Sequence, residues 1–128
     1  MDWYNDMIQF HLEVMEDTIP TYPQIPDDKC KTLRIALITE EVGETLKAIE
    51  EDDIVEIADG IADSIVVLLG TAVMYGIDIR PIFQEVHENN MTKKDGPMSP
   101  TGKRLKPANW QPPRIRELLL KQGMLEAI

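Results

Sequence analysis

The sequence predicts an all-α fold, a bundle of four to five helices, and two observations carry that prediction. Apolar residues recur at intervals of three and four, and no segment alternates apolar and polar residues as a half-buried strand does. Two proline-rich stretches, residues 17–28 and 92–113, separate the periodic segments. With 128 residues and 14.6 kDa, the chain suits a single domain over residues 1–128.

The first helix is expected over about residues 3–16, with Asp2 as its N-cap. Its apolar residues form one stripe: Trp3, Met7, Phe10 and Val14. Residues 17–28 contain Pro20, Pro23 and Pro26, so we expect an extended connector.

Two long helices follow, the second over about residues 28–51 and the third from the acidic turn at 50–53 to about Tyr75, with Gly76 after its end. One face of the second helix is apolar: Ile35, Ile38, Val42, Leu46 and Ile49. The third helix is apolar on most sides, which places it in the middle of a bundle. Because one chain offers too few helices to cover it, we expect a symmetric dimer or a larger assembly.

The fourth helix is expected over about residues 80–90, with Asp78 as its cap and Pro81 in its first turn. Residues 92–113 hold two of the seven glycines and five of the nine prolines, and long irregular loops of this kind are often functional. Residues 114–128 are predicted to form a short amphipathic helix.

Composition narrows the function classes. The net charge of −10 argues against general nucleic-acid binding and against anionic membranes. A single cysteine excludes an internal disulfide framework and a Cys-based zinc site. The acidic start is unlike a secretory leader, and the apolar run 65–77 is shorter than a membrane span. We therefore expect a cytoplasmic protein with no nucleic-acid or membrane partner.

The two long helices carry six carboxylates, most of them spaced three or four residues apart, as residues on one helix face are. The second helix carries Glu40, Glu41 and Glu44, and the third carries Glu56, Asp59 and Asp63. Glu41 and Glu44 continue an apolar line through Leu33, Leu37 and Ala48, whereas Glu40 borders the wet face. The acids of the third helix continue into Val67, Gly70 and Met74. This pattern predicts that the carboxylates point inward, which is unfavourable without partners.

A hard divalent cation would resolve this conflict. Lys47 lies on the wet face, and Arg34 alone cannot balance so many acids. Mg²⁺, with Mn²⁺ as a substitute, binds carboxylate oxygens and completes its shell with water and substrate phosphates. Neither His11 nor His87 has a ligand spacing, so a soft-metal site is not indicated. The simpler interpretation, a solvated acidic face, applies to residues 50–53 and stays open for Glu40.

The motifs EEVGE (residues 40–44) and EIAD (56–59) resemble the signature of the all-α NTP pyrophosphohydrolase superfamily, the MazG-like proteins. Three further segments resemble its phosphoribosyl-ATP pyrophosphohydrolase branch: ADSIVVLLGTAVMYGID, HENNMTK and GKRLKP. The resemblance implies Mg²⁺-dependent cleavage of a nucleoside triphosphate to monophosphate and pyrophosphate. It implies metal ligation by Glu41, Glu44, Glu56 and Asp59, with Glu40 helping to position the attacking water or a further metal ion. It also implies substrate contacts from Asn90 and Lys93, and a dimer or dimer of dimers with shared sites.

Charge is also divided along the chain in a way that suits a triphosphate. Residues 40–63 contain ten acids and one base, whereas residues 93–106 contain five bases and one acid. We expect the basic loop to contact phosphates, with Lys106 as a further substrate-binding residue. Trp110 is interpreted either as a base-stacking residue or as a loop anchor, and His11 as a substrate contact or a structural histidine. Two alternatives stay open: phosphoribosyl-ATP as the substrate, and a non-enzymatic metal-binding interaction module.

Overall fold

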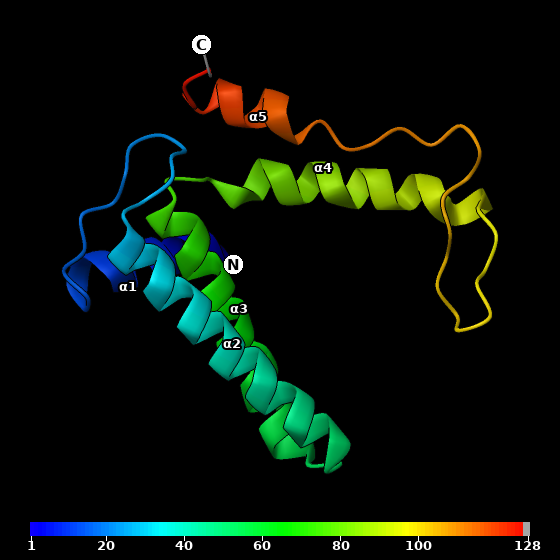
Figure 1. Cartoon of the computed structure of the whole chain (residues 1–128), viewed down its shortest axis with the longest axis horizontal. Coiled ribbons are helices and arrows are strands. Elements are labelled where there is room, and N and C mark those ends of the chain that lie inside the picture. The colour runs from blue at the N-terminus through cyan, green and yellow to red at the C-terminus, as the bar shows by residue number, and fades with distance from the viewer. Residues whose placement is uncertain (127–128) are drawn as a thin grey trace.

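The computed structural model describes residues 1–126 and confirms the all-α prediction (Figure 1). Its elements, in chain order, are α1 (Trp3–Glu13), α2 (Asp28–Glu50), α3 (Ile54–Met74), α4 (Ile79–Met91), the 3-10 helix η1 (Thr92–Asp95) and α5 (Ile115–Lys121). Within these residues no strand forms, and one isolated antiparallel bridge joins Met98 to Arg104.

The helices form two arms that diverge from a common corner (Figure 1). In the first arm α2 and α3 pack along their length as an antiparallel hairpin, and α1 crosses the base of α3. In the second arm α4 and α5 lie side by side, and the loop between them extends from the far end of α4. The bundle of a single chain therefore consists of α1 to α3, and α4 and α5 stand apart from it.

An aspartate caps each of the first four helices. Asp2, Asp27, Asp53 and Asp78 each accept a hydrogen bond from a backbone N–H in the first turn. The carboxylate also opposes the positive end of the helix dipole. At the other end of α3, Gly76 has φ +68°, and a Cβ there would lie 2.2 Å from the Tyr22 carbonyl oxygen. The caps predicted at Asp2 and Asp78 and the glycine predicted to follow α3 are confirmed.

The buried core lies at the corner, where α1 crosses α3. It is formed by Tyr4, Met7, Ala72 and Val73. Val73 is fully enclosed, and partly buried residues from the connector and from the start of α4 pack around this core. The core fixes the base of the hairpin, and its distal half is held only by contacts between α2 and α3.

Apolar residues of the hairpin face solvent to an unusual extent. On α2, Ile35 is 66% exposed and Leu46 is 58% exposed; on α3, Ile54 is 75% exposed and Leu68 is 51% exposed. As the sequence predicts, the helices of one chain do not cover α3 on all sides, because a hairpin covers only one stripe of each helix. Monomers rarely expose so much contiguous apolar surface.

By length and apolar composition α3 could also span a membrane, the one such helix among residues 1–126. The uncharged run 65–77 is by itself shorter than a membrane span. Helix α3, however, begins eleven residues before this run and includes three acids. The core helix of a soluble bundle has the same properties, so the finding by itself is weak.

Two helix ends and one loop differ from the sequence prediction. Helix α1 ends at Glu13, and the chain turns at Glu16, where φ is +54°. Helix α5 ends at Lys121 because Gly123 adopts φ +99°, so it is much shorter than the predicted 114–128; residues 127 and 128 lie outside the described part. The loop expected to be irregular contains η1 and the Met98–Arg104 bridge.

Candidate active site

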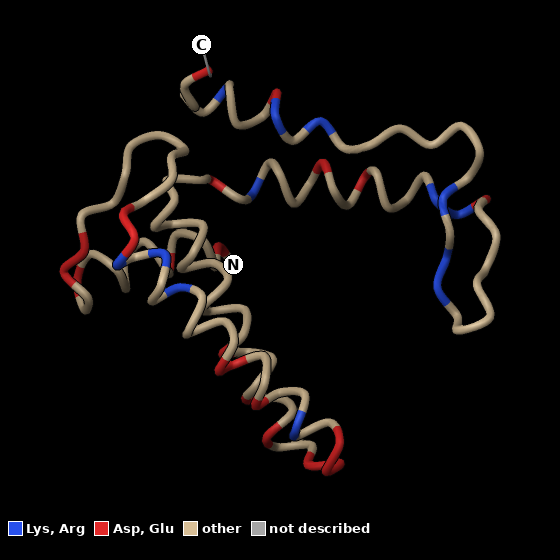
Figure 2. The backbone as a smooth tube through the Cα atoms, in the orientation of Figure 1, with Lys and Arg blue, Asp and Glu red and all other residues tan. Residues whose placement is uncertain are grey.

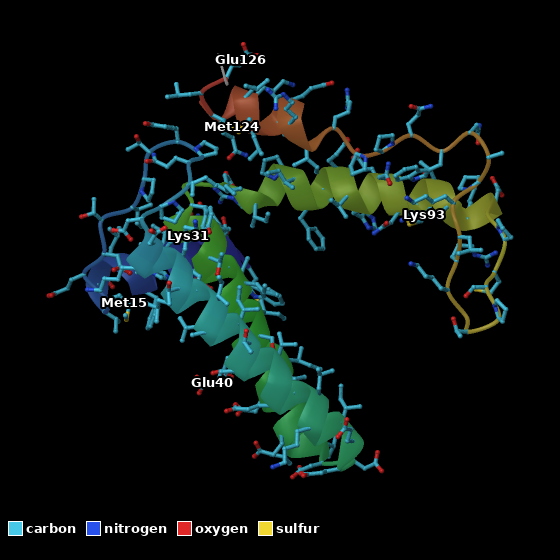
Figure 3. The ribbon with its side chains drawn as sticks, viewed as in Figure 1. Met15, Lys31, Glu40, Lys93, Met124 and Glu126 are labelled. Atoms are coloured by element: carbon cyan, nitrogen blue, oxygen red, sulfur yellow. The ribbon has the colours of Figure 1, made fainter. Side chains whose placement is uncertain are left out.

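The six carboxylates lie along the α2–α3 hairpin but do not enter a common interior. Glu41 and Asp63 are half-buried, whereas the other four are exposed: Glu40, Glu44, Glu56 and Asp59. Glu40 points away from the hairpin (Figure 3). The expectation that all the acids except Glu40 are carried inward is therefore wrong for the single chain, since the outer side of the hairpin has no covering helix.

Glu41 differs from the other acids because one of its oxygens is buried and because four of the other carboxylates act on its charge. Its Oε2 atom is removed from solvent and has no hydrogen-bond partner. Burial raises the pKa of Glu41, and the negative charges of four neighbours raise it further: Asp63, Glu44, Glu40 and Asp59. Five carboxylates thus lie within electrostatic range of one another. Glu56 is not among the groups that act on Glu41.

The predicted metal ligands do not converge on one point in the free chain. Across residues 1–126, no three His, Cys, Asp or Glu side chains stand close enough to hold a metal ion. The donor chemistry nevertheless fits a hard divalent cation, because every group is a carboxylate and the buried Glu41 oxygen lacks a partner. Glu41, Glu44, Glu56 and Asp59 would need side-chain rotation or a neighbouring chain to close around it.

A close contact between α2 and α3 lies one helical turn from Glu41. Gly60 of α3 packs against Thr45 of α2, and a Cβ at Gly60 would lie 2.5 Å from Thr45 Oγ1. The Thr45 hydroxyl donates to the Glu41 carbonyl oxygen at 2.7 Å and lies 3.2 Å from Ser64 Oγ. Sequence reasoning missed Gly60, Thr45 and Ser64; a glycine inside a helical apolar pattern was the available signal.

A cavity of about 480 Å³ opens one helical turn from the acids, toward the corner of the fold. Leu37 and Val67 line it, and these residues lie four positions from Glu41 and Asp63 on the same helices. Most of the lining is apolar and comes from α1, α2 and α3. Such a cavity with a few fixed polar groups is typical of small-molecule sites.

His11 and Arg34 are the buried polar groups of this cavity, 3% and 6% exposed. His11 Nδ1 lies 2.7 Å from Asp17 Oδ2. Arg34 donates from Nε to Thr71 Oγ1 at 3.0 Å and from Nη2 to the Val67 carbonyl oxygen at 2.7 Å.

The approach of these two side chains depends on a glycine. A Cβ at Gly70 would lie 2.8 Å from both Arg34 Nη2 and His11 Nε2. Burial lowers the pKa of Arg34, and its hydrogen bonds go to α3 rather than to the acids. Arg34 therefore does not neutralise the carboxylates that come after it on α2.

The second arm brings together the three residues predicted to bind substrate. Lys93 Nζ donates to Asn90 Oδ1 at 3.0 Å and lies 5.8 Å from the centroid of the Trp110 indole. Lys106 Nζ lies 4.1 Å from the same centroid. The indole Nε1 donates to Asn89 Oδ1 at 2.9 Å, so Trp110 anchors the loop to α4 rather than to the core.

The acidic and basic groups lie on different arms. Acids are concentrated toward the distal end of the hairpin, and lysine and arginine are concentrated in the loop at the far end of α4 (Figure 2). Glu40 and Lys93 mark this separation in Figure 3. One chain in this conformation therefore does not bring its own basic loop to its own carboxylates.

A family model described as phosphoribosyl-ATP pyrophosphohydrolase matches residues 8–90, which is more than half of the chain. The match includes both acidic motifs and ends at Asn90, before Lys93, Lys106 and the loop. No curated protein matches the chain significantly. The matched family lies within the MazG-like all-α superfamily, and its members are hydrolases of phosphoric anhydrides. The chain therefore belongs to the phosphoribosyl-ATP pyrophosphohydrolase family.

Proposed function

We propose that this pyrophosphohydrolase requires Mg²⁺ and cleaves the α–β anhydride of a nucleoside triphosphate, releasing a monophosphate and pyrophosphate. The observation that carries the proposal is the unpartnered Glu41 oxygen among five electrostatically coupled carboxylates. Such a group is unfavourable in the free chain and becomes favourable when a divalent cation and a phosphate complete it.

Glu41, Glu44, Glu56 and Asp59 would hold the cation. When bound, Mg²⁺ or Mn²⁺ neutralises charge on phosphate oxygens and lowers the pKa of water. Glu40, exposed beside Glu41, would accept a proton from the water that attacks the α-phosphorus. The new bond joins the water oxygen to the α-phosphorus, the α–β anhydride bond breaks, and pyrophosphate leaves with the bridging oxygen.

The cavity beside the acids would take the nucleoside portion. Its apolar walls suit a base or sugar, and His11 Nε2 and the Arg34 guanidinium provide polar contacts at its buried end. A substrate whose α-phosphate lies at Glu41 and Asp63 would have its nucleoside within one helical turn of this cavity.

Phosphoribosyl-ATP is the second candidate substrate, and the family match favours it. It contains the same triphosphate as ATP, so one set of carboxylates would serve either molecule. Competition between phosphoribosyl-ATP and a panel of canonical and modified NTPs and dNTPs separates the two candidates by their kcat/KM. Family membership weighs against the non-enzymatic interaction module.

We also propose that the protein acts as a symmetric dimer or dimer of dimers in the cytoplasm. Two findings support the assembly: the exposed apolar faces of α2 and α3, and the separation of acids from bases in one chain. A second copy could cover the apolar faces and bring its Lys93 and Lys106 to the carboxylates of the first. The net charge of −10 supports the further proposal that nucleic acid is not a partner of this protein.

The decisive assay measures pyrophosphate release from the nucleotide panel with Mg²⁺, with Mn²⁺ and with a chelator. We expect release only with a divalent cation, and a loss of at least a hundredfold in Glu41→Gln and in Glu44→Gln. Glu50→Gln, an exposed acid on the same helix outside the motif, serves as the control. No release from any nucleotide, or full release by the double variant of Glu41 and Glu44, would refute the proposal.

Shared sites can be tested by mixing two inactive variants, Glu41→Gln and the double variant Lys93→Ala with Lys106→Ala. If the loop acts on the neighbouring chain, each mixed dimer has one intact site. Random exchange then restores roughly a quarter of the wild-type activity. If the loop folds back onto its own hairpin, every site keeps one defect and mixing restores nothing.

A further inference from the structure

A second pocket, of about 340 Å³, lies at the end of α4. It is lined by Asn90, Met91, Lys93, Lys94 and Arg104. Three of these five residues are cations and none is an acid, in a protein whose net charge is −10. Lys93 was already a candidate from the sequence, whereas Lys94 and Arg104 were not.

The turn of the loop fixes Arg104 at the pocket. Its backbone pairs with Met98, and its Nη1 donates to the Gly96 carbonyl oxygen at 2.7 Å. The neighbouring Leu105 N–H donates to the Pro97 carbonyl oxygen at 2.7 Å, and a Cβ at Gly96 would lie 1.8 Å from the Leu105 carbonyl oxygen. The close approach of Gly96 to Leu105 therefore requires glycine at position 96. A guanidinium has five N–H donors in a planar fork, so one bond to Gly96 leaves most of them for a ligand.

The other two cations are oriented from the α4 side. Lys93 is held by Asn90 Oδ1 and by the Trp110 ring, and Lys94 follows it in η1. Among residues 1–126, no carboxylate forms a salt bridge with Lys93, Lys94 or Arg104. Three like charges around one pocket repel one another, and an anion with several oxygens removes that repulsion.

We propose that this pocket binds the pyrophosphate portion of the substrate, the β- and γ-phosphates, with Arg104 and Lys94 as binding residues beside Lys93. The inference rests on the proposed function, since it assigns the phosphates that the acidic hairpin does not hold. The fork of Arg104 matches two phosphate oxygens, and the lysines supply point charges. Lys106 lies on Trp110 and is not part of the pocket lining.

The test measures binding of inorganic pyrophosphate to the full chain, so that no turnover is needed. A Trp3→Phe background leaves Trp110 as the single tryptophan, and its fluorescence reports on the adjacent Lys93. We expect Arg104→Gln to weaken pyrophosphate affinity by about tenfold or more, as for the loss of a charged hydrogen bond. Lys103→Gln removes the same charge from the neighbouring exposed residue outside the pocket, and we expect less than a twofold change.

Equal effects of Arg104→Gln and Lys103→Gln would overturn the inference, because net charge alone would then explain binding. Arg104→Lys checks geometry: it keeps the charge but loses the fork, so wild-type affinity in this variant would also count against the inference. A protein that hydrolyses nucleotides while its pyrophosphate affinity is independent of Arg104 refutes only this site. A protein that binds pyrophosphate through Arg104 but hydrolyses no nucleotide refutes the proposed function and leaves the site supported.

Discussion

Replacing Gly60 by alanine tests the helix contact that lies beside the candidate site. The new methyl carbon would lie 2.5 Å from Thr45 Oγ1 and 3.1 Å from Thr45 Cα. The hydroxyl can move away only by giving up its contacts with the Glu41 carbonyl and with Ser64, and the Cα is part of the α2 backbone. Overpacking of this kind costs about 1–3 kcal/mol, whereas alanine gains about 0.5–1 kcal/mol over glycine within a helix. We therefore expect a net loss of up to about 2.5 kcal/mol, centred on about 1 kcal/mol, in the free energy of unfolding.

Gly43→Ala is the matched control on the opposite helix. A Cβ at Gly43 meets nothing within 4 Å, so only the gain in helix propensity remains. The two variants should shift the midpoint of urea unfolding in opposite directions. Both must be measured at one protein concentration, because association also stabilises. A Gly60→Ala protein as stable as the wild type would refute the close packing of α2 against α3 at Thr45.

Two further predictions concern Glu41 and Trp110. Burial and neighbouring carboxylates raise the pKa of Glu41, so the folded protein binds this proton more tightly than the unfolded chain does. In chelator, the stability contributed by the protonated form is lost as pH rises from about 4.3 through the raised pKa. In urea titrations, Glu41→Gln should therefore become more stable than the wild type across this range and keep that advantage above it. A difference that is the same at every pH would contradict this reasoning. Trp110→Leu should raise KM for the nucleotide more than it lowers kcat, because it frees Lys93 and Lys106, and Trp110→Phe should restore most of the loss by keeping an aromatic face. Equal KM values for Leu and Phe would refute that role.

Local features of the fold could be predicted from the sequence because their causes are local. The period of apolar residues identifies the helices, and Asp2, Asp78 and Gly76 mark helix boundaries through bonds made within a few residues. The extent of α5 was wrong because amphipathic spacing continues past Gly123, where the backbone leaves the helix. The prediction that the acids other than Glu40 point into the interior was also wrong for the single chain. The spacing gives the face of a helix on which the acids lie, but not what covers that face.

The residues that sequence reasoning missed are those whose role depends on distant partners. Arg34 bonds to Thr71 across 37 positions, and no pattern along α2 indicates that contact. Gly70 matters because two side chains from other helices converge on it. In the sequence Arg104 cannot be told from other basic residues of the loop. In the structure its bond to the Gly96 carbonyl oxygen holds it at the pocket beside Lys93. The order and spacing of the acids, in contrast, identified the superfamily before any contact was known, and the further segments such as HENNMTK identified the branch.

The separation of charge between the arms has a thermodynamic consequence for binding. On the hairpin the charges of four carboxylates repel the charge of Glu41, and at the end of α4 three cations around one pocket repel one another. If the loop of a second copy reaches the hairpin as proposed, a triphosphate with a divalent cation would relieve both repulsions at once, whereas either ligand alone would relieve only one. Metal and nucleotide should therefore bind cooperatively, and linkage requires each to strengthen the other by the same factor. Calorimetry with a non-hydrolysable nucleotide measures both factors. Tight metal binding that is unaffected by nucleotide would mean that the acidic hairpin and the basic loop serve separate ligands.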